Sequence, residues 1–303
     1  MSAPASALVT FAGVVVVAVA LLHVFATLFA RAGGRSPSRV LIRGTWVLLR
    51  RLSSSPRLLS LAGPVAFLGV VFAWIAALVV GCALIYWPEI PDGFVYAAGV
   101  SPDRASALAE ALYVSLVALG TLGYGEIAPA DGWIKLVAPL EALLGLGLVA
   151  ATVSWLLSVS PVLSRRRALA YEISLLHGQG SEPSPGEPAG LLPAGVYAEL
   201  TSRLVAVERD LVAFPVSYYF HDDDRRFALP ATIGYLLDLA EAGARPDAPE
   251  PVRLHAVILR RAIDDFAASV AERFHGELRG STREVLGAYA RDHAVVPSPW
   301  PAG

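Results

Sequence analysis

The sequence predicts an all-α membrane protein. We expect three membrane-crossing helices, a short re-entrant helix and loop between the second and third of them, and a helical domain at the C-terminus. Of the 303 residues, 55% are hydrophobic and 17% are charged, whereas soluble domains have about 45 to 50% and about 25%. The apolar excess lies in residues 1–164, and the remainder has an ordinary globular composition. A membrane half therefore precedes a soluble half.

Charge and cysteine content exclude some classes of function. The formal net charge of -2 excludes the strongly basic surface of a nucleic-acid-binding protein. The single cysteine, Cys82, excludes an intrachain disulfide framework and a cysteine zinc cluster. No nucleophile, base and orienting partner recur at a recognisable spacing, so we expect no enzyme.

Three stretches are long enough to cross a bilayer, which needs about 20 apolar residues in a helix. Met1 to Ala30 and Leu58 to Pro88 contain no Asp, Glu, Lys or Arg, and Leu136 to Ser164 contains only Glu141. The first stretch lacks a basic start and is too long for a cleaved signal, so we interpret it as a retained anchor helix.

The loops predict the orientation in the cell membrane. Seven arginines and no acidic residue lie between the first two spans, acidic residues outnumber basic ones between the second and third, and Arg165, Arg166 and Arg167 follow the third. Because basic loops stay in the cytoplasm, we expect the N-terminus outside and the C-terminal half inside. Ser38 to Leu52 resembles an interfacial helix on anionic inner-leaflet lipid, although a plain connector is the alternative.

The outer loop carries the informative residues. Pro102 to Leu119 is predicted to be a helix, with Ser101 as its cap and Pro102 at the first helical position. Its uncharged part is too short to span, so we expect it to dip into the membrane and return. It ends in Gly120-Thr121-Leu122-Gly123-Tyr124-Gly125-Glu126.

This heptapeptide suits an ion filter. Gly123 and Gly125 can adopt positive φ, so successive carbonyls from Thr121 to Tyr124 can point the same way. Irregular backbone at membrane depth must line a path for water or ions. Four copies around an axis would form stacked oxygen rings that replace the hydration shell of a potassium ion, and the Thr121 hydroxyl would add the innermost ring.

The sequence TLGYGE resembles the TVGYGD signature of potassium channels, and residues 60–165 resemble their two-helix pore module. The resemblance implies a potassium-selective homotetramer without a cofactor, in which K⁺ is the permeant ion. The implied ion-binding residues are Thr121, Leu122, Gly123, Tyr124 and Gly125, with Glu126 at the outer mouth. A departure from the family pattern is Gly120, which replaces a common Thr. Another is Tyr113-Val114, which replaces an aromatic pair, so we expect a weaker or different brace behind the filter.

The third span would line the inner pore. Gly145 and Gly147 are candidate gating hinges, or else small residues for close helix packing. Pro161 is expected to bend or end the helix. We expect Glu141 to form a structural hydrogen bond to the pore helix or filter region rather than to bind ions. Voltage sensing is not supported, because the first span contains only His23 among basic side chains.

The soluble half is predicted to be helical over Val196 to Val212, Ala228 to Ala242, and Pro251 to about Tyr289 with interruptions at glycines 276, 280 and 287. A nucleotide-binding Rossmann domain is not indicated. The cluster His221, Asp222, Asp223 and Asp224 is a weak candidate for a divalent cation, and a solvated turn is the alternative.

The sequence thus divides into an N-terminal transmembrane helix (1–30), a basic cytoplasmic or interfacial linker (31–57), a pore domain (58–164), a helix extension and linker (165–188) and a helical cytoplasmic domain (189–303). We predict a potassium channel, with gating by the cytoplasmic domain. The alternative is a non-conducting scaffold or receptor that signals through this domain.

Overall fold

A computed structural model describes residues 2–29, 44, 62–102, 106–178, 191–276 and 280–293. The expected basic linker, its interfacial helix and the linker from Gln179 to Pro188 lie outside this part of the chain, apart from Gly44. The described part consists of helices and two short strands, which confirms the all-α class. The chain divides into two compact units, Met1–Ile42 with Phe67–Leu157 and Arg43–Ala66 with Ser158–Gly303.

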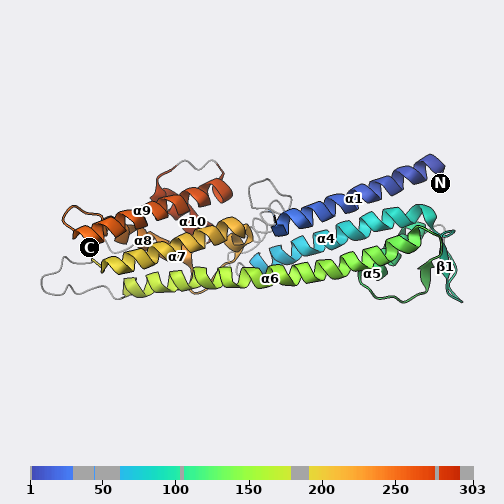
Figure 1. The fold of residues 1–303 in the computed structure, drawn as a ribbon, viewed down its shortest axis with the longest axis horizontal. Coiled ribbons are helices and arrows are strands. Elements are labelled where there is room, and N and C mark those ends of the chain that lie inside the picture. Colours follow the sequence, from blue (N-terminus) through green and yellow to red (C-terminus); the bar gives the residue numbers. More distant parts are fainter. Residues whose placement is uncertain are drawn as a thin grey trace. The chain divides into compact units, whose positions relative to one another are not determined.

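Three helices of the described part are long and apolar enough to cross a membrane, as predicted. They are α1 (Ala3–Phe29), α4 (Ala62–Tyr86) and α6 (Ile134–Gly178) (Figure 1). Helix α6 continues past Pro161 to Gly178, so the expectation that Pro161 could end it is wrong. Buried Val159, Val162 and Leu163 flank the proline, and this packing offsets the loss of one backbone hydrogen bond.

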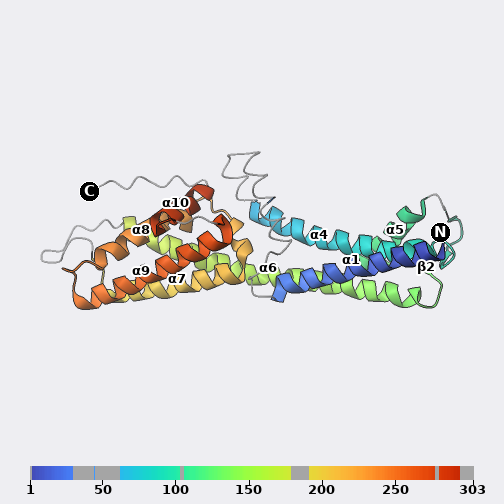
Figure 2. The ribbon, with the colours of Figure 1, turned by 90° about the horizontal axis from the view of Figure 1, so that it is seen from above.

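Helix α1 packs against α4 through glycines (Figures 1 and 2). A Cβ added at Gly13 would lie 2.6 Å from the Gly81 carbonyl oxygen, and a Cβ at Gly81 would lie 2.7 Å from a methyl of Val17. Small residues of this kind let two membrane helices approach closely. Trp74 Nε1 also donates to His23 Nδ1 at 3.0 Å, so His23 is a packed residue.

A short antiparallel pair, β1 (Phe94–Tyr96) and β2 (Ile127–Pro129), brackets α5 (Ala107–Leu119). The predicted helix start is wrong, because Ser101 and Pro102 lie outside α5. Pro102 fixes its own φ but does not force the following residues into a helix. Helix α5 is instead the stretch with a buried face, made by Ala111, Val114, Ser115 and Leu119.

The second unit contains a group of packed helices, α7 (Ala194–Ala213), α8 (Leu229–Gly243), α9 (Glu250–Val270) and α10 (Thr282–Asp292), seen from two sides in Figures 1 and 2. A 3-10 turn, Pro215–Tyr219, follows α7, and a π turn, Ala271–His275, follows α9. The first two predicted helices of the soluble half are confirmed. The predicted stretch from Pro251 corresponds to α9 and α10, and the predicted interruption at Gly276 is confirmed, because the chain leaves the helix there with φ 67°. The predicted interruption at Gly287 is wrong. Gly287 lies inside α10 and does not interrupt it.

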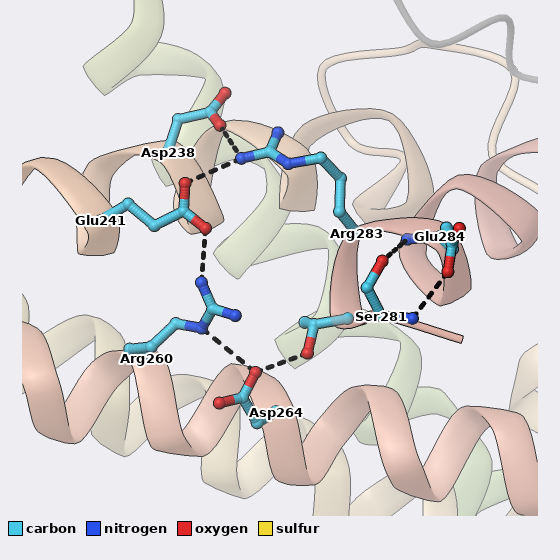
Figure 3. A network of polar contacts seen from close by, with 8 residues as sticks. Asp238, Glu241, Arg260, Asp264, Ser281, Arg283 and Glu284 are labelled. Carbon is cyan, nitrogen blue, oxygen red and sulfur yellow. Dashed lines mark hydrogen bonds and ion pairs between the residues drawn. The ribbon is translucent and has the colours of Figure 1, made fainter. Parts of the chain in front are cut away.

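A polar network joins α8, α9 and α10 (Figure 3). Arg283 donates to Asp238 and Glu241, and Arg260 contacts Glu241 and Asp264. The Thr282 hydroxyl also donates to Asp264. Ser281 and Glu284 form a reciprocal capping box at the start of α10, and such a box satisfies two backbone donors that the helix leaves unpaired. These contacts fix the start of α10 relative to the other two helices.

Candidate functional site

The segment after α5 has an unusual backbone. Thr121, Gly123 and Gly125 have φ values of 54°, 62° and 79°, and Thr121 is the only described non-glycine residue with a positive φ. The sign of φ therefore alternates from Thr121 to Gly125, since Leu122 and Tyr124 lie on the negative side. Alternation between left-handed and right-handed conformations lets successive carbonyls point to one side. The two glycine positions match the sequence prediction, whereas the Thr121 conformation was not predicted.

Side chains of this segment point away from the protein core. Leu122 and Tyr124 are 56% and 63% exposed in the single chain. The sequence prediction was that they pack against surroundings that support the filter. The part of the chain that the structure describes leaves them uncovered.

The end of α5 supports the segment Thr121 to Gly125, the predicted filter segment, from one side. The backbone N–H groups of Gly120, Thr121 and Leu122 donate to carbonyls of the last turns of α5 at 2.9 to 3.0 Å. These bonds satisfy carbonyls that a helix end leaves without partners. The Tyr113 hydroxyl donates to Glu126, so a direct contact joins the pore helix to the residue expected at the outer mouth.

Glu141 connects the three elements that surround the filter segment. It is 1% exposed, and it accepts hydrogen bonds from Tyr86 of α4 at 2.7 Å and from Ser115 of α5 at 2.5 Å. A buried carboxylate in a membrane segment is costly without such partners. The expected structural bond to the pore helix is thus present, and Glu141 fixes α6 against α5.

The hinge candidates have different surroundings. A Cβ at Gly145 would overlap the carbonyl of Leu119, the last residue of α5, whereas a Cβ at Gly147 would meet nothing within 4 Å. Gly145 is therefore a close-packing contact between α6 and α5. Gly147 has no packing requirement within the described chain. Pro161 lies inside α6.

The residues of the candidate cation cluster have other partners. Asp222 forms ion pairs with Arg166 at 2.9 Å and Arg167 at 2.5 Å, and Asp224 pairs with Arg226 at 2.7 Å. Burial lowers the pKa of His221. No three His, Cys, Asp or Glu residues of the described chain lie together in a way that could hold a metal ion.

These contacts give the C-terminal part of α6 a role that the sequence did not reveal. Arg165 binds both carboxylate oxygens of Asp210 at 2.7 and 2.8 Å. Arg166 is 5% exposed and also donates to the carbonyls of Ser217 and Phe220. The three arginines, interpreted from sequence as topology signals, bind the helices and turns of the second unit.

Residues 73–159 match the model of a family described as ion channel. They run from α4 through α5 and the filter segment into α6. With the fold above, this match defines a membrane protein that contains an ion channel domain. The chain is also similar to the uncharacterized membrane protein YdjJ of Bacillus subtilis (strain 168), with 26% identity over 255 residues that cover 80% of this chain and 72% of that protein. No solved structure matches the chain.

Proposed function

We propose that the protein is a potassium-selective channel of the cell membrane, built as a homotetramer around the segment Thr121 to Gly125. The observation that carries the proposal is the alternating sign of φ along this segment, which lies between two membrane helices of an ion channel domain. K⁺ is the permeant ion, and conduction needs no cofactor.

The chemistry of selection follows from the backbone. Carbonyls from Thr121 to Tyr124 that point to one side would give one oxygen per ring from each chain. A closed set of four chains would supply the oxygen number that replaces the water around K⁺. The Thr121 hydroxyl would add the innermost ring.

Exposed apolar side chains of the single chain support the assembly. Leu122 and Tyr124 have no cover, and α6 carries an exposed stripe at helical spacing. Such a stripe must face lipid, a pore or another copy, because an apolar patch of this size is unusual on a monomer in water. The stripe comprises Leu136, Leu140, Leu143, Leu146, Val149, Val153 and Leu157.

Orientation and gating complete the proposal. The arginine-rich sequence between the first two spans supports an N-terminus outside and a second unit in the cytoplasm, with anionic lipid at the inner leaflet. Helix α6 is unbroken from Ile134 to Gly178, so a change in the arrangement of the cytoplasmic helices would act on the inner pore helix.

Flux measurements on purified protein in liposomes test the proposal. K⁺ and Rb⁺ should enter and Na⁺ should not, because Na⁺ is too small for the oxygen rings. Tyr124→Asp should abolish this selectivity. Equal Na⁺ and K⁺ flux would rule out a selective filter, and absence of any flux would favour a non-conducting scaffold.

Native mass measurement in detergent tests the assembly separately. The proposal predicts a species of four chains. A protein that conducts but is found only as a monomer or dimer would contradict the four-fold filter.

A further inference from the structure

A pocket of about 260 Å³ opens in the second unit between α6 and α8. Helix α6 contributes Ser174 and His177, and α8 contributes Thr232 and Tyr235. The turn before α8 contributes Arg225 and Arg226. None of the described lining residues is acidic. The filter and its supports use none of these side chains.

The lining combines guanidinium groups with hydroxyl groups, of which Ser174 and Thr232 already donate to the carbonyls of Tyr171 and Leu229. Two guanidinium groups and an imidazole share the pocket with three hydroxyl groups. Guanidinium groups bind phosphate and carboxylate groups with paired hydrogen bonds, and hydroxyls complete such sites. The lining therefore suits an anion far better than a cation.

Neighbouring contacts fix the walls before any ligand arrives. Arg226 donates hydrogen bonds to Asp224 from Nε and Nη2. Its third nitrogen, Nη1, does not contact Asp224 in this ion pair. The Arg226 guanidinium carbon lies 5.9 Å from the centre of the Phe227 ring, which in turn stacks on Tyr171 of α6 at 5.0 Å. His177 and Tyr235 meet edge to face at 4.9 Å. A site with positioned side chains loses less conformational freedom on binding.

We propose that this pocket binds a small soluble anion that carries a phosphate or carboxylate group. Its volume lies below the 300 to 1,000 Å³ that is usual for sites of drug-sized ligands, so the ligand is a small metabolite or inorganic anion. At 1.5 Å per residue, about 15 Å of helix separate Ser174 from Ser164, the expected membrane end of α6. This distance favours a soluble anion over a lipid headgroup.

Ligand binding would also regulate the channel, an inference that rests on the proposed function. Ser174 and His177 belong to α6, the helix that also carries Glu141 and Gly145. A bound anion would favour arrangements in which α6 and α8 remain together. A ligand shifts a conformational equilibrium only if its affinity for the two states differs. An anion that contacts both α6 and α8 binds more tightly when these helices are together, which provides that difference.

Thermal shift measurements on the full-length protein in detergent test the site, with inorganic phosphate, AMP and citrate as probes at constant ionic strength. At least one probe should raise Tm relative to chloride. Arg225→Gln and His177→Gln affect exposed side chains, so both variants should fold, and each should weaken binding about tenfold or more. Arg261→Gln, which alters an exposed α9 arginine paired with Asp265, is the matched control and should bind like the parent protein.

Three results would overturn the site. The first is that no probe shifts Tm. The second is that the probes shift the Tm of Arg225→Gln and of the parent protein equally. The third is that none of the soluble probes shifts Tm, whereas added vesicles that contain phosphatidylglycerol do. The binding assay is independent of conduction, so the two proposals can fail separately. Binding without any flux would reject the channel and keep the site. Selective flux that the bound probe leaves unchanged in the parent protein would reject the regulatory role.

Discussion

At the level of single residues, backbone strain in the filter segment is concentrated at Thr121. A β-branched residue with φ 54° costs on the order of 1 to 3 kcal/mol. Backbone bonds from Thr121 to Ala118 and from Leu122 to Val117, at 3.0 and 2.9 Å, hold the chain in this conformation. Strain of this kind persists where the surroundings determine the backbone, which is typical of functional sites.

The neighbouring glycine gives a sharp substitution test. Gly123 has φ 62°, and a Cβ there would meet nothing within 4 Å in the single chain, so within one chain Gly123→Ala acts through backbone strain, at about 1 to 2 kcal/mol. We expect the K⁺ preference over Na⁺ to fall about tenfold or more, measured by liposome flux. Gly69→Ala also enters open space, within helix α4, and should leave selectivity unchanged. Equal selectivity in both variants would argue against a filter at this position.

The burial of His293 predicts that the second unit becomes less stable in acid. It is 2% exposed, and burial lowers its pKa to about 4, although the carbonyls of Tyr218 and Tyr289, at 2.7 and 3.0 Å from its ring nitrogens, oppose this shift. The unfolded chain binds a proton near pH 6.5 and the folded chain only near pH 4. Stability is therefore complete above pH 6.5 and falls as the pH drops towards 4, by about 2 kcal/mol between pH 7.5 and 5.

This pH dependence is measured by unfolding the second unit with urea in the full-length protein. Pulse proteolysis detects the unfolded fraction at each urea concentration. His293→Gln should reduce the difference between pH 7.5 and 5, and His221, whose pKa burial also lowers, should account for a remainder. If the variant shows the same pH dependence as the parent protein, His293 is not the responsible group.

At the level of elements, two glycines on α6 separate packing from hinge motion. Gly145→Ala forces a methyl group into the Leu119 carbonyl at the end of α5, so we expect α5 to shift and both flux and tetramer yield to fall. Gly147→Ala meets open space and should assemble normally. Native mass and liposome flux of both variants check this. Normal assembly and flux of Gly145→Ala would show that this contact is dispensable.

A buried ion pair lies within the second unit, between the C-terminal part of α6 and the chain that follows the turn Pro215–Tyr219. Arg166 and Asp222 side chains are each 6% exposed and lie 2.9 Å apart, so Asp222→Asn leaves a buried charge without its partner, at a cost of about 3 to 5 kcal/mol. The Tm of the second unit should fall on the order of 10 °C. Asp224→Asn removes the partner of a more exposed arginine, Arg226, and should change Tm little. Similar losses in both variants would contradict the assigned roles.

Long elements of this fold could be predicted from the sequence, whereas short ones could not. Apolar runs and helical periodicity predicted α1, α4, α6, α7 and α8, because each element carries its own signal over many residues. The strands β1 and β2 span only three residues each, too few for an alternation pattern. The start of α5 depends on which residues are buried, and the partners of Asp222 depend on tertiary contacts.

At the candidate site, the sequence predicted the positive φ of two glycines and the bond of Glu141, but not the remaining features. Gly123 and Gly125 indicate positive φ by their residue type, whereas Thr121 gives no such signal. The Glu141 bond to α5 was predicted from the cost of a buried charge. The anion pocket was missed, because its residues come from α6, α8 and the turn before α8, and no motif connects them along the sequence.

At the level of the whole molecule, the chain contains two units with separate chemistry. The first contains the ion channel domain, the alternating backbone at Thr121 to Gly125 and the Glu141 contacts. The second contains the arginine contacts of α6 and the pocket. Because α6 contributes residues to both units, the proposed anion and the proposed filter act on one continuous helix.

The reversal potential in a planar bilayer is the sharpest test of potassium selectivity. Purified protein is inserted into a bilayer with KCl on one side and NaCl at the same concentration on the other. The variant Gly123→Ala is the control. The account predicts a reversal potential far from zero, in the direction of a current carried by K⁺ almost alone, and a value much closer to zero for the variant. A current that reverses near zero in the parent protein would contradict potassium selectivity.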